Sequence, residues 1–284
     1  MMQPPTPHTL EAPLPGLSFL GTVVESMRQA LLLLLRNRLL WCIVGIEALL
    51  GAIGFGLAGV ATERLDGREL FSLFAWWFLA SVLMPWTTMY LAVQAVHGDI
   101  DDRTCQYVFL RPVRRAALLL GRWLAVILLA LLVAEFGCAT LFLGVAGRPA
   151  LWSDGVDVPL GVAFAVVLAV GTVAHAALGT WFAASCRRPL VWSAAALTLQ
   201  TLIALLPMSA GIRMATIADP LRRMVLDRIE PGAKLARLLW PGERDYRSEL
   251  IGQPLLSLVV LTFVVMVLAL RSYARSEYDS RPRD

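Results

Sequence analysis

Three ionisable side chains stand inside long apolar stretches of the sequence, where a charge is costly: Glu47, Glu135 and His175. At about 1.5 Å per helical residue, each lies roughly 12 to 18 Å from an end of its stretch. An unpaired charge at that depth in hydrocarbon is expensive, so these groups should face protein or a water-filled cavity, or be neutral. Two roles stay open for them: a polar patch along a translocation path, or hydrogen bonds that hold helices together.

Small residues recur at steps of four near two of these groups. Gly171 and Gly179 lie on either side of the histidine, which leaves room for another helix and favours a packing role. Ala48, Ala52 and Gly56 form a similar stripe beyond the first glutamate. We expect this stripe to pack against another helix of the same chain.

Sequence motifs for catalysis, metal binding and ATP binding are missing. There is no His-Glu-x-x-His motif, no Gly-x-Ser-x-Gly motif and no carboxylate cluster in an apolar stretch. The cysteines form no Cys-x-x-Cys pair that would suggest zinc or a disulfide. The only lysine, Lys234, does not belong to a P-loop. We therefore expect no catalytic residue, metal or cofactor in this chain, and a six-helix intramembrane enzyme is a less favoured alternative.

The composition places the chain in a membrane. Of its 284 residues, 58% are apolar and 16% are charged, whereas soluble domains carry about 25% charged residues. So few charges disfavour a soluble nucleic-acid-binding protein, a secreted disulfide scaffold and a disordered chain. The net charge of +4 fits basic loops on the cytosolic side of a membrane, so we expect no nucleic-acid partner.

Six stretches have the length of transmembrane helices, about 20 apolar residues for a hydrocarbon core of about 30 Å. They are 39–61, 70–96, 123–146, 158–186, 189–212 and 250–270. Hydrocarbon offers no partner to open backbone groups and the stretches do not alternate, so helices are predicted and a barrel is not. The predicted fold class is all-α integral membrane, with one transmembrane domain over 17–271, a disordered cytosolic tail over 1–16 and a cytosolic tail over 272–284. Pro85 and Pro207 are expected to kink the second and fifth spans.

The basic residues orient the chain. With both termini in the cytosol, most basic residues of the short loops lie inside, as expected for a multi-pass protein of the bacterial cytoplasmic (inner) membrane. The basic segment 213–249 then lies outside and argues against this orientation. The reverse orientation would violate the rule at every other loop, so we expect both termini to be cytosolic.

A further helix is predicted before the first span, over 17–38. Ser18, Thr22, Glu25 and Gln29 recur there at steps of four, three and four, with apolar residues elsewhere. One polar stripe on an apolar helix indicates a helix lying in the membrane interface. The alternative is a cytosolic extension of the first span.

Short helices are also predicted within 213–249, over 221–229 and 234–240, each followed by a Pro-Gly break. We expect them on the outer membrane face, between the fifth and sixth spans. There they either meet a periplasmic partner or only cover the surface, with arginines reaching towards the headgroups.

The segment 97–122 joins the second and third predicted spans and has the sequence HGDIDDRTCQYVFLRPVRRAALLLGR. Three aspartates precede the run 103–110, and carboxylates favour a helix N-terminus. Pro112 disfavours helical geometry at Arg111 and suits the first turn of a following helix. The segment thus predicts a short cytosolic helix, a break and a new helix that enters the third span. Its apolar middle and charged ends suit docking to another protein, and a plain basic loop with interfacial aromatics is the alternative.

This segment resembles the coupling loop of the type-2 (exporter-like) permease family of ATP-binding cassette (ABC) transporters. In that family an acidic stretch, often ending in Glu-x-Gly-Thr, leads to Leu-x-x-Arg-Pro-Val-x-Arg and then Leu-Leu-Gly-Lys. The corresponding elements here are Asp102-Arg103-Thr104, Phe109-Leu110-Arg111-Pro112-Val113-Arg114-Arg115 and Leu119-Leu120-Gly121-Arg122. Arg103 stands where glycine is usual, and Arg122 replaces a lysine with its charge kept.

The resemblance implies a membrane-spanning permease subunit, more often of an exporter, that carries no cofactor itself. A separate ATP-binding subunit, present in two copies, would hold ATP and Mg and press on a coupling helix between the second and third spans. Contact with it is implied for Asp99, Asp101, Asp102, Arg103, Thr104, Tyr107, Phe109, Arg111, Pro112 and Arg115. A second permease copy, identical or related, would complete a dimer around the cargo path, for which Glu47, Glu135 and His175 are the candidates. A non-transporting membrane scaffold with the same docking loop is the remaining alternative.

Overall fold

The computed structural model describes residues 18–60, 67–101, 115–147, 158–205, 212–213, 215–226 and 252–275. Within these ranges the chain forms helices and no strand. The helices are α1 (Phe19–Leu35), α2 (Arg38–Val60), α3 (Gly67–Phe74), η1 (Ala75–Leu83), α4 (Met84–Asp101), α6 (Arg115–Ala146), α7 (Val158–Ser185), α8 (Pro189–Leu205), α10 (Ala218–Leu226) and α12 (Gly252–Arg275).

Five helical spans of the described part are long and apolar enough to cross a membrane: α2, the continuous α3–η1–α4, α6, α7 and α12. Large apolar side chains such as Trp41, Leu132 and Phe263 are 60% or more exposed on the outside of the bundle. A water-facing surface would not carry so many of them. The chain is thus an all-helical protein with the features of a multi-pass membrane protein.

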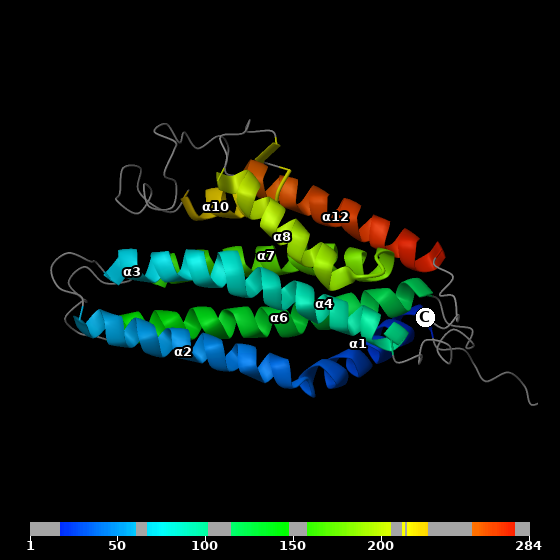
Figure 1. The fold of residues 1–284 in the computed structure, drawn as a ribbon, viewed down its shortest axis with the longest axis horizontal. Coiled ribbons are helices and arrows are strands. Elements are labelled where there is room, and N and C mark those ends of the chain that lie inside the picture. The colour runs from blue at the N-terminus through cyan, green and yellow to red at the C-terminus, as the bar shows by residue number, and fades with distance from the viewer. Residues whose placement is uncertain are drawn as a thin grey trace, which may run out of the picture.

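Successive long helices run in opposite directions along the long axis of the molecule, which is horizontal in Figure 1. α2 packs along α6, α4 along α7, and α12 along α7. This alternation brings α1, the end of α4, the start of α6 and the end of α12 to one end of the molecule, at the right in Figure 1. The two ends of the predicted coupling segment therefore lie beside the two ends of the described chain.

The fifth predicted span is described only in part. α8 ends at Leu205, and its apolar portion, Pro189–Ile203, is shorter than the about 20 residues that a membrane crossing needs. Residues 206–211, with Pro207, lie outside the described ranges. The sixth crossing of the membrane therefore stays a prediction.

The second predicted span contains a π-helix. η1 ends directly before α4, in which Pro85 is the second residue, and the Met84 N–H donates to the carbonyl of Leu79 five residues back. Proline has no N–H to continue an ordinary helical ladder through this point. The sequence predicts a kink at Pro85, and the structure has nine residues of wider helix directly before α4. The kink itself stays a prediction.

The helix predicted over 17–38 is present as α1. The Ser18 hydroxyl caps it by accepting the Gly21 N–H at 3.1 Å, and Asn37 starts α2 by accepting the Leu39 N–H at 2.9 Å. α1 is therefore a helix of its own and does not extend α2. Part of the predicted polar stripe faces protein, because Thr22 is buried against α6 together with the neighbouring row Ser26, Ala30 and Leu34. Its place at the membrane interface stays a prediction.

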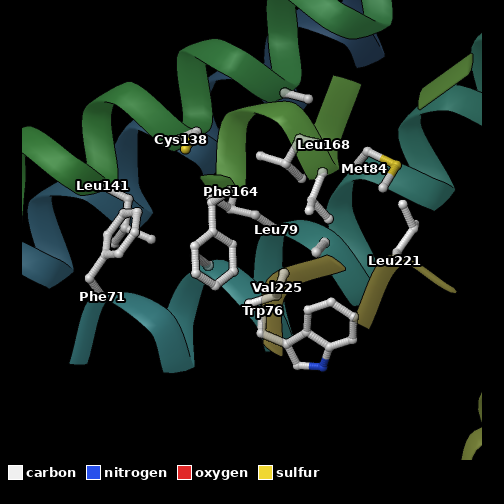
Figure 2. Packing of buried hydrophobic residues seen from close by; sticks show 14 of the residues in the cluster. Phe71, Trp76, Leu79, Met84, Cys138, Leu141, Phe164, Leu168, Leu221 and Val225 are labelled. Carbon is white, nitrogen blue, oxygen red and sulfur yellow. The ribbon is translucent and has the colours of Figure 1, made fainter. Parts of the chain in front are cut away.

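The main core cluster lies where α3, η1, α6, α7 and α10 meet (Figure 2). Phe71 stands edge-on to Phe142 and Phe164, with ring centroids 5.7 and 5.4 Å apart. Leu221 and Val225 from α10 complete this cluster. The helix predicted from Leu221 is thus present, starting at Ala218, and it is built into the core where the sequence predicts a surface helix. The predicted helix 234–240 lies outside the described ranges.

Candidate functional site

The predicted coupling segment emerges between two well-packed helices. Asp99 and Asp101 belong to the last turn of α4, and Arg115 begins α6. Seven predicted contact residues lie outside the described ranges: Asp102, Arg103, Thr104, Tyr107, Phe109, Arg111 and Pro112. The coupling helix itself therefore stays a prediction, and the structure describes the two helix ends that would hold it.

The start of α6 is braced on both sides. The Ser26 hydroxyl of α1 donates to the carbonyl of Leu118 at 2.8 Å, and the Arg115 guanidinium donates to the carbonyl of Ala274 in α12 at 3.3 Å. A Cβ on Gly121 would collide with the Val23 carbonyl and come within 2.7 Å of the Ser26 Cβ. A glycine is thus required for α1 to lie this close, and a displacement of the segment at this end would act on α1 and α12 as well as on α6.

Glu47 is enclosed between α2 and α6, with 1% of its surface exposed. Its Cδ occupies the space above Gly137, where a Cβ would approach it to 3.0 Å. Its Oε2 has no hydrogen-bond partner in the part of the chain that the structure describes. The carboxyl group therefore sits in a tight helix contact of this single chain.

Glu135 has different surroundings. It is half-buried on the side of α6 that faces α7, whereas Glu47 lies between α2 and α6. It lines a groove of about 200 Å³ between α6 and α7 whose other walls include Phe142, Val158 and Gly161. Within the described ranges it forms no ion pair. A carboxyl group at this depth in an otherwise apolar groove is a functional candidate by default.

His175 is 2% exposed and hydrogen-bonded within the bundle. Its Nδ1 donates to the Gly171 carbonyl at 2.8 Å, and its ring is also hydrogen-bonded to the side chain of Gln200 in α8. Gly179 allows close approach of α4, since a Cβ there would meet the Cβ of Ala92 at 2.8 Å. Such contacts are expected if His175 holds helices together, which is the role that the flanking glycines favour.

A small cavity of about 60 Å³ adjoins this histidine, between η1, α7, α8 and α10. Ser81, Gln200, Thr201 and Arg222 give it polar walls. Glu135 and His175 line two different pockets of the described part, and Glu47 lines neither of these two.

Two charged features are not identified by the sequence motifs. Arg223 Nε lies 2.9 Å from Asp219 Oδ2 in α10, and Asp219 is 1% exposed. Arg222 lies over the ring of Trp76, 5.6 Å from its centroid. The four-residue spacing of an ion pair is visible in sequence, but its burial is not.

The second feature is a basic pocket of about 300 Å³ between α4 and the turn that joins α7 to α8. His97, Arg187 and Arg188 line it. His97 lies far from the two adjacent arginines in sequence, so only the fold shows that they meet.

Elsewhere in the described ranges, no three side chains of the His, Cys, Asp and Glu types come together in a way that could hold a metal ion. No protein family model and no curated protein matches the sequence.

Proposed function

We propose that this chain is the membrane-spanning permease subunit of an ABC transporter, an exporter, driven by a separate ATP-binding subunit. The observation that carries the proposal is the motif Leu110-Arg111-Pro112-Val113-Arg114-Arg115 between two membrane helices. The family resemblance of the segment 97–122 makes it the coupling helix. The proposal includes six membrane crossings, both termini in the cytosol of a bacterium, and a dimer of identical or related permeases with two ATP-binding subunits.

The packing around the segment gives it a way to act on the bundle. α6 has 32 residues and is therefore about 48 Å long, more than the about 30 Å of hydrocarbon. Its first turns extend beyond the membrane, where α1 and α12 grip them through Ser26 and Arg115. When the ATP-binding subunits close and open, the push on the coupling helix passes to three helices at once.

The three intramembrane groups fit this function in different ways. Glu135 opens on a groove of this chain, so it is the candidate that cargo or a second permease reaches most directly. Glu47 and His175 are enclosed and hold helices together unless the bundle rearranges during transport. With both termini in the cytosol, the segment 213–249 is on the periplasmic side of the membrane, where it would contact a periplasmic partner.

The substitution Arg111→Glu tests the proposal. The chain is purified from membranes of its native host, and the chains that co-purify with it are searched for one that contains a P-loop. We expect Arg111→Glu to reach the membrane normally but to lose capture of the ATP-binding chain and stimulation of its ATP hydrolysis, because the charge that pairs with the partner is reversed.

Arg148→Glu is the matched control, since it makes the same charge change in a predicted outer loop. It should leave capture and hydrolysis unchanged. Equal capture by wild type and Arg111→Glu would overturn the docking role and the function that rests on it.

A further inference from the structure

A basic pocket lies at the end of the bundle where α4 ends. It holds about 300 Å³ and is formed by the last turns of α4, the turn after α7 and the first turn of α8. Its walls are Val93, Gln94, His97, Gly98, Arg187, Arg188, Pro189, Leu190 and Val191. Its volume is many times the roughly 30 Å³ of a water molecule, so a polar group of some size fits.

The charge of this pocket is positive. Arg187 and Arg188 are exposed, and each brings a positively charged guanidinium group. The lining contains no acidic side chain to neutralise them. Gln94 supplies a further donor, and the N–H groups of Leu190 and Val191, in the first turn of α8, have no acceptor within the helix. The pocket thus offers an anion several donors from three segments.

The surroundings of the pocket are apolar on one side. Leu190, Val191 and Trp192 follow the arginines directly and are 47%, 61% and 56% exposed. The membrane helix α7 ends at Ser185, two residues before the first arginine. The arginines therefore lie at headgroup level, and the exposed side chains of α8 continue from there along the hydrocarbon, with a tryptophan at the boundary.

We propose that this pocket binds the phosphate of an anionic phospholipid. The two arginines pair with the phosphate, and Leu190, Val191 and Trp192 lie against the acyl chains. A soluble phosphate compound would satisfy the arginines but would leave the apolar side uncovered, which favours a lipid. The site does not depend on the transport function proposed above.

The test measures lipid binding to the full chain, purified in a phosphatidylcholine background. Phosphatidylglycerol is added, and binding is followed by native mass spectrometry and by the rise in the midpoint of thermal unfolding. We expect Arg187→Gln/Arg188→Gln to weaken phosphatidylglycerol binding by roughly tenfold to thirtyfold, since each basic residue near a membrane surface contributes about 1 kcal/mol.

The double variant Arg271→Gln/Arg275→Gln is the matched control. It removes the same charge from exposed positions of α12 that lie at the same end of the molecule and do not line the pocket. It should bind phosphatidylglycerol like wild type. Equal weakening in both double variants would overturn the proposal, because the effect would then come from net charge alone.

Additional variants and a competition experiment complete the test. Arg187→Lys/Arg188→Lys should keep most of the binding, because both charges remain. If the glutamine pair fails to fold, the single variants Arg187→Gln and Arg188→Gln replace it, and each should weaken binding by roughly fivefold. Inorganic phosphate and glycerol 3-phosphate should compete only weakly. Full displacement of the lipid by either compound would show a soluble-phosphate site and overturn the lipid assignment, as would the absence of any preference for phosphatidylglycerol over phosphatidylcholine.

Discussion

At the scale of single residues, two acid–arginine pairs differ in their surroundings. Asp219 and Arg223 are enclosed in the core, with side-chain exposures of 1% and 11%. Glu25 and Arg28 lie on α1, 3.8 Å apart, with side-chain exposures of 44% and 72%. Removing one member of a buried pair takes away the other member's close opposite charge at a place with little water, whereas an exposed pair contributes little because solvent screens it.

We therefore predict that Asp219→Ala lowers the free energy of unfolding by about 3 to 5 kcal/mol. Glu25→Ala should change it by no more than about 1 kcal/mol. Thermal unfolding of both purified variants in the same detergent checks this. Similar shifts for the two variants would contradict the burial of α10 in the core.

The sequence identifies the ionisable groups within the apolar stretches but not how each is surrounded. Glu47, Glu135 and His175 are evident because ionisable residues in apolar stretches are rare. The Glu47 carboxyl group packs against Gly137 of α6, whereas Glu135 lines an open groove. That difference depends on how the neighbouring helix covers each face: α6 covers Glu47, whereas α7 leaves a groove beside Glu135.

At the scale of elements, α2 and α6 touch through glycines. A Cβ on Gly51 would lie 2.8 Å from the Thr140 carbonyl oxygen, and a Cβ on Gly144 would collide with the carbonyl oxygen of Gly51. The stripe of Ala48, Ala52 and Gly56, which the sequence predicts as the packed face, is instead exposed. That prediction is wrong because the spacing of small residues shows where a close contact is allowed, whereas the bulkier side chains around it decide which face is used.

Gly51→Ala should therefore destabilise the protein by about 1 to 3 kcal/mol, because the added methyl group forces α2 and α6 apart. Gly45→Ala on the same helix is the control, since a Cβ there meets nothing within 4 Å. It should be neutral or stabilising by up to about 1 kcal/mol, because alanine favours a helix more than glycine does. Thermal unfolding measures both, and equal stability of the two variants would argue against the α2–α6 contact.

Hydropathy predicts the positions of the long helices well and their hydrogen bonding poorly. α2 and α7 match the predicted spans closely, and α6 begins at Arg115, before the apolar stretch 123–146 and close to Pro112, where the sequence predicts the start of a helix that enters the third span. A search for apolar length alone does not detect this extension, whereas the position of Pro112 indicates it. The π-helix before Pro85 is likewise invisible, because hydropathy reports apolar length and not which carbonyl each N–H reaches.

At the scale of the whole molecule, the alternation of the helices gathers the features of interest at one end. The end of α4, the start of α6, α1 and the end of α12 meet there (Figure 1), and the basic pocket lies beside the last turns of α4. The sequence predicts this arrangement from the order of the spans and the position of the arginines. It does not predict the pocket, because Gln94 and Arg187 come together only after the bundle forms.

The central claim is that the segment 97–122 docks to an ATP-binding subunit, and site-specific photocrosslinking tests it most directly. The photoreactive residue p-benzoylphenylalanine replaces Tyr107 in the segment. As a control it replaces Leu57, which lies near the C-terminal end of α2. After illumination of intact membranes, we predict that position 107 forms an adduct with a chain that contains a P-loop and that position 57 does not. An adduct of position 107 with lipid alone, in a protein that has reached the membrane, would contradict the account.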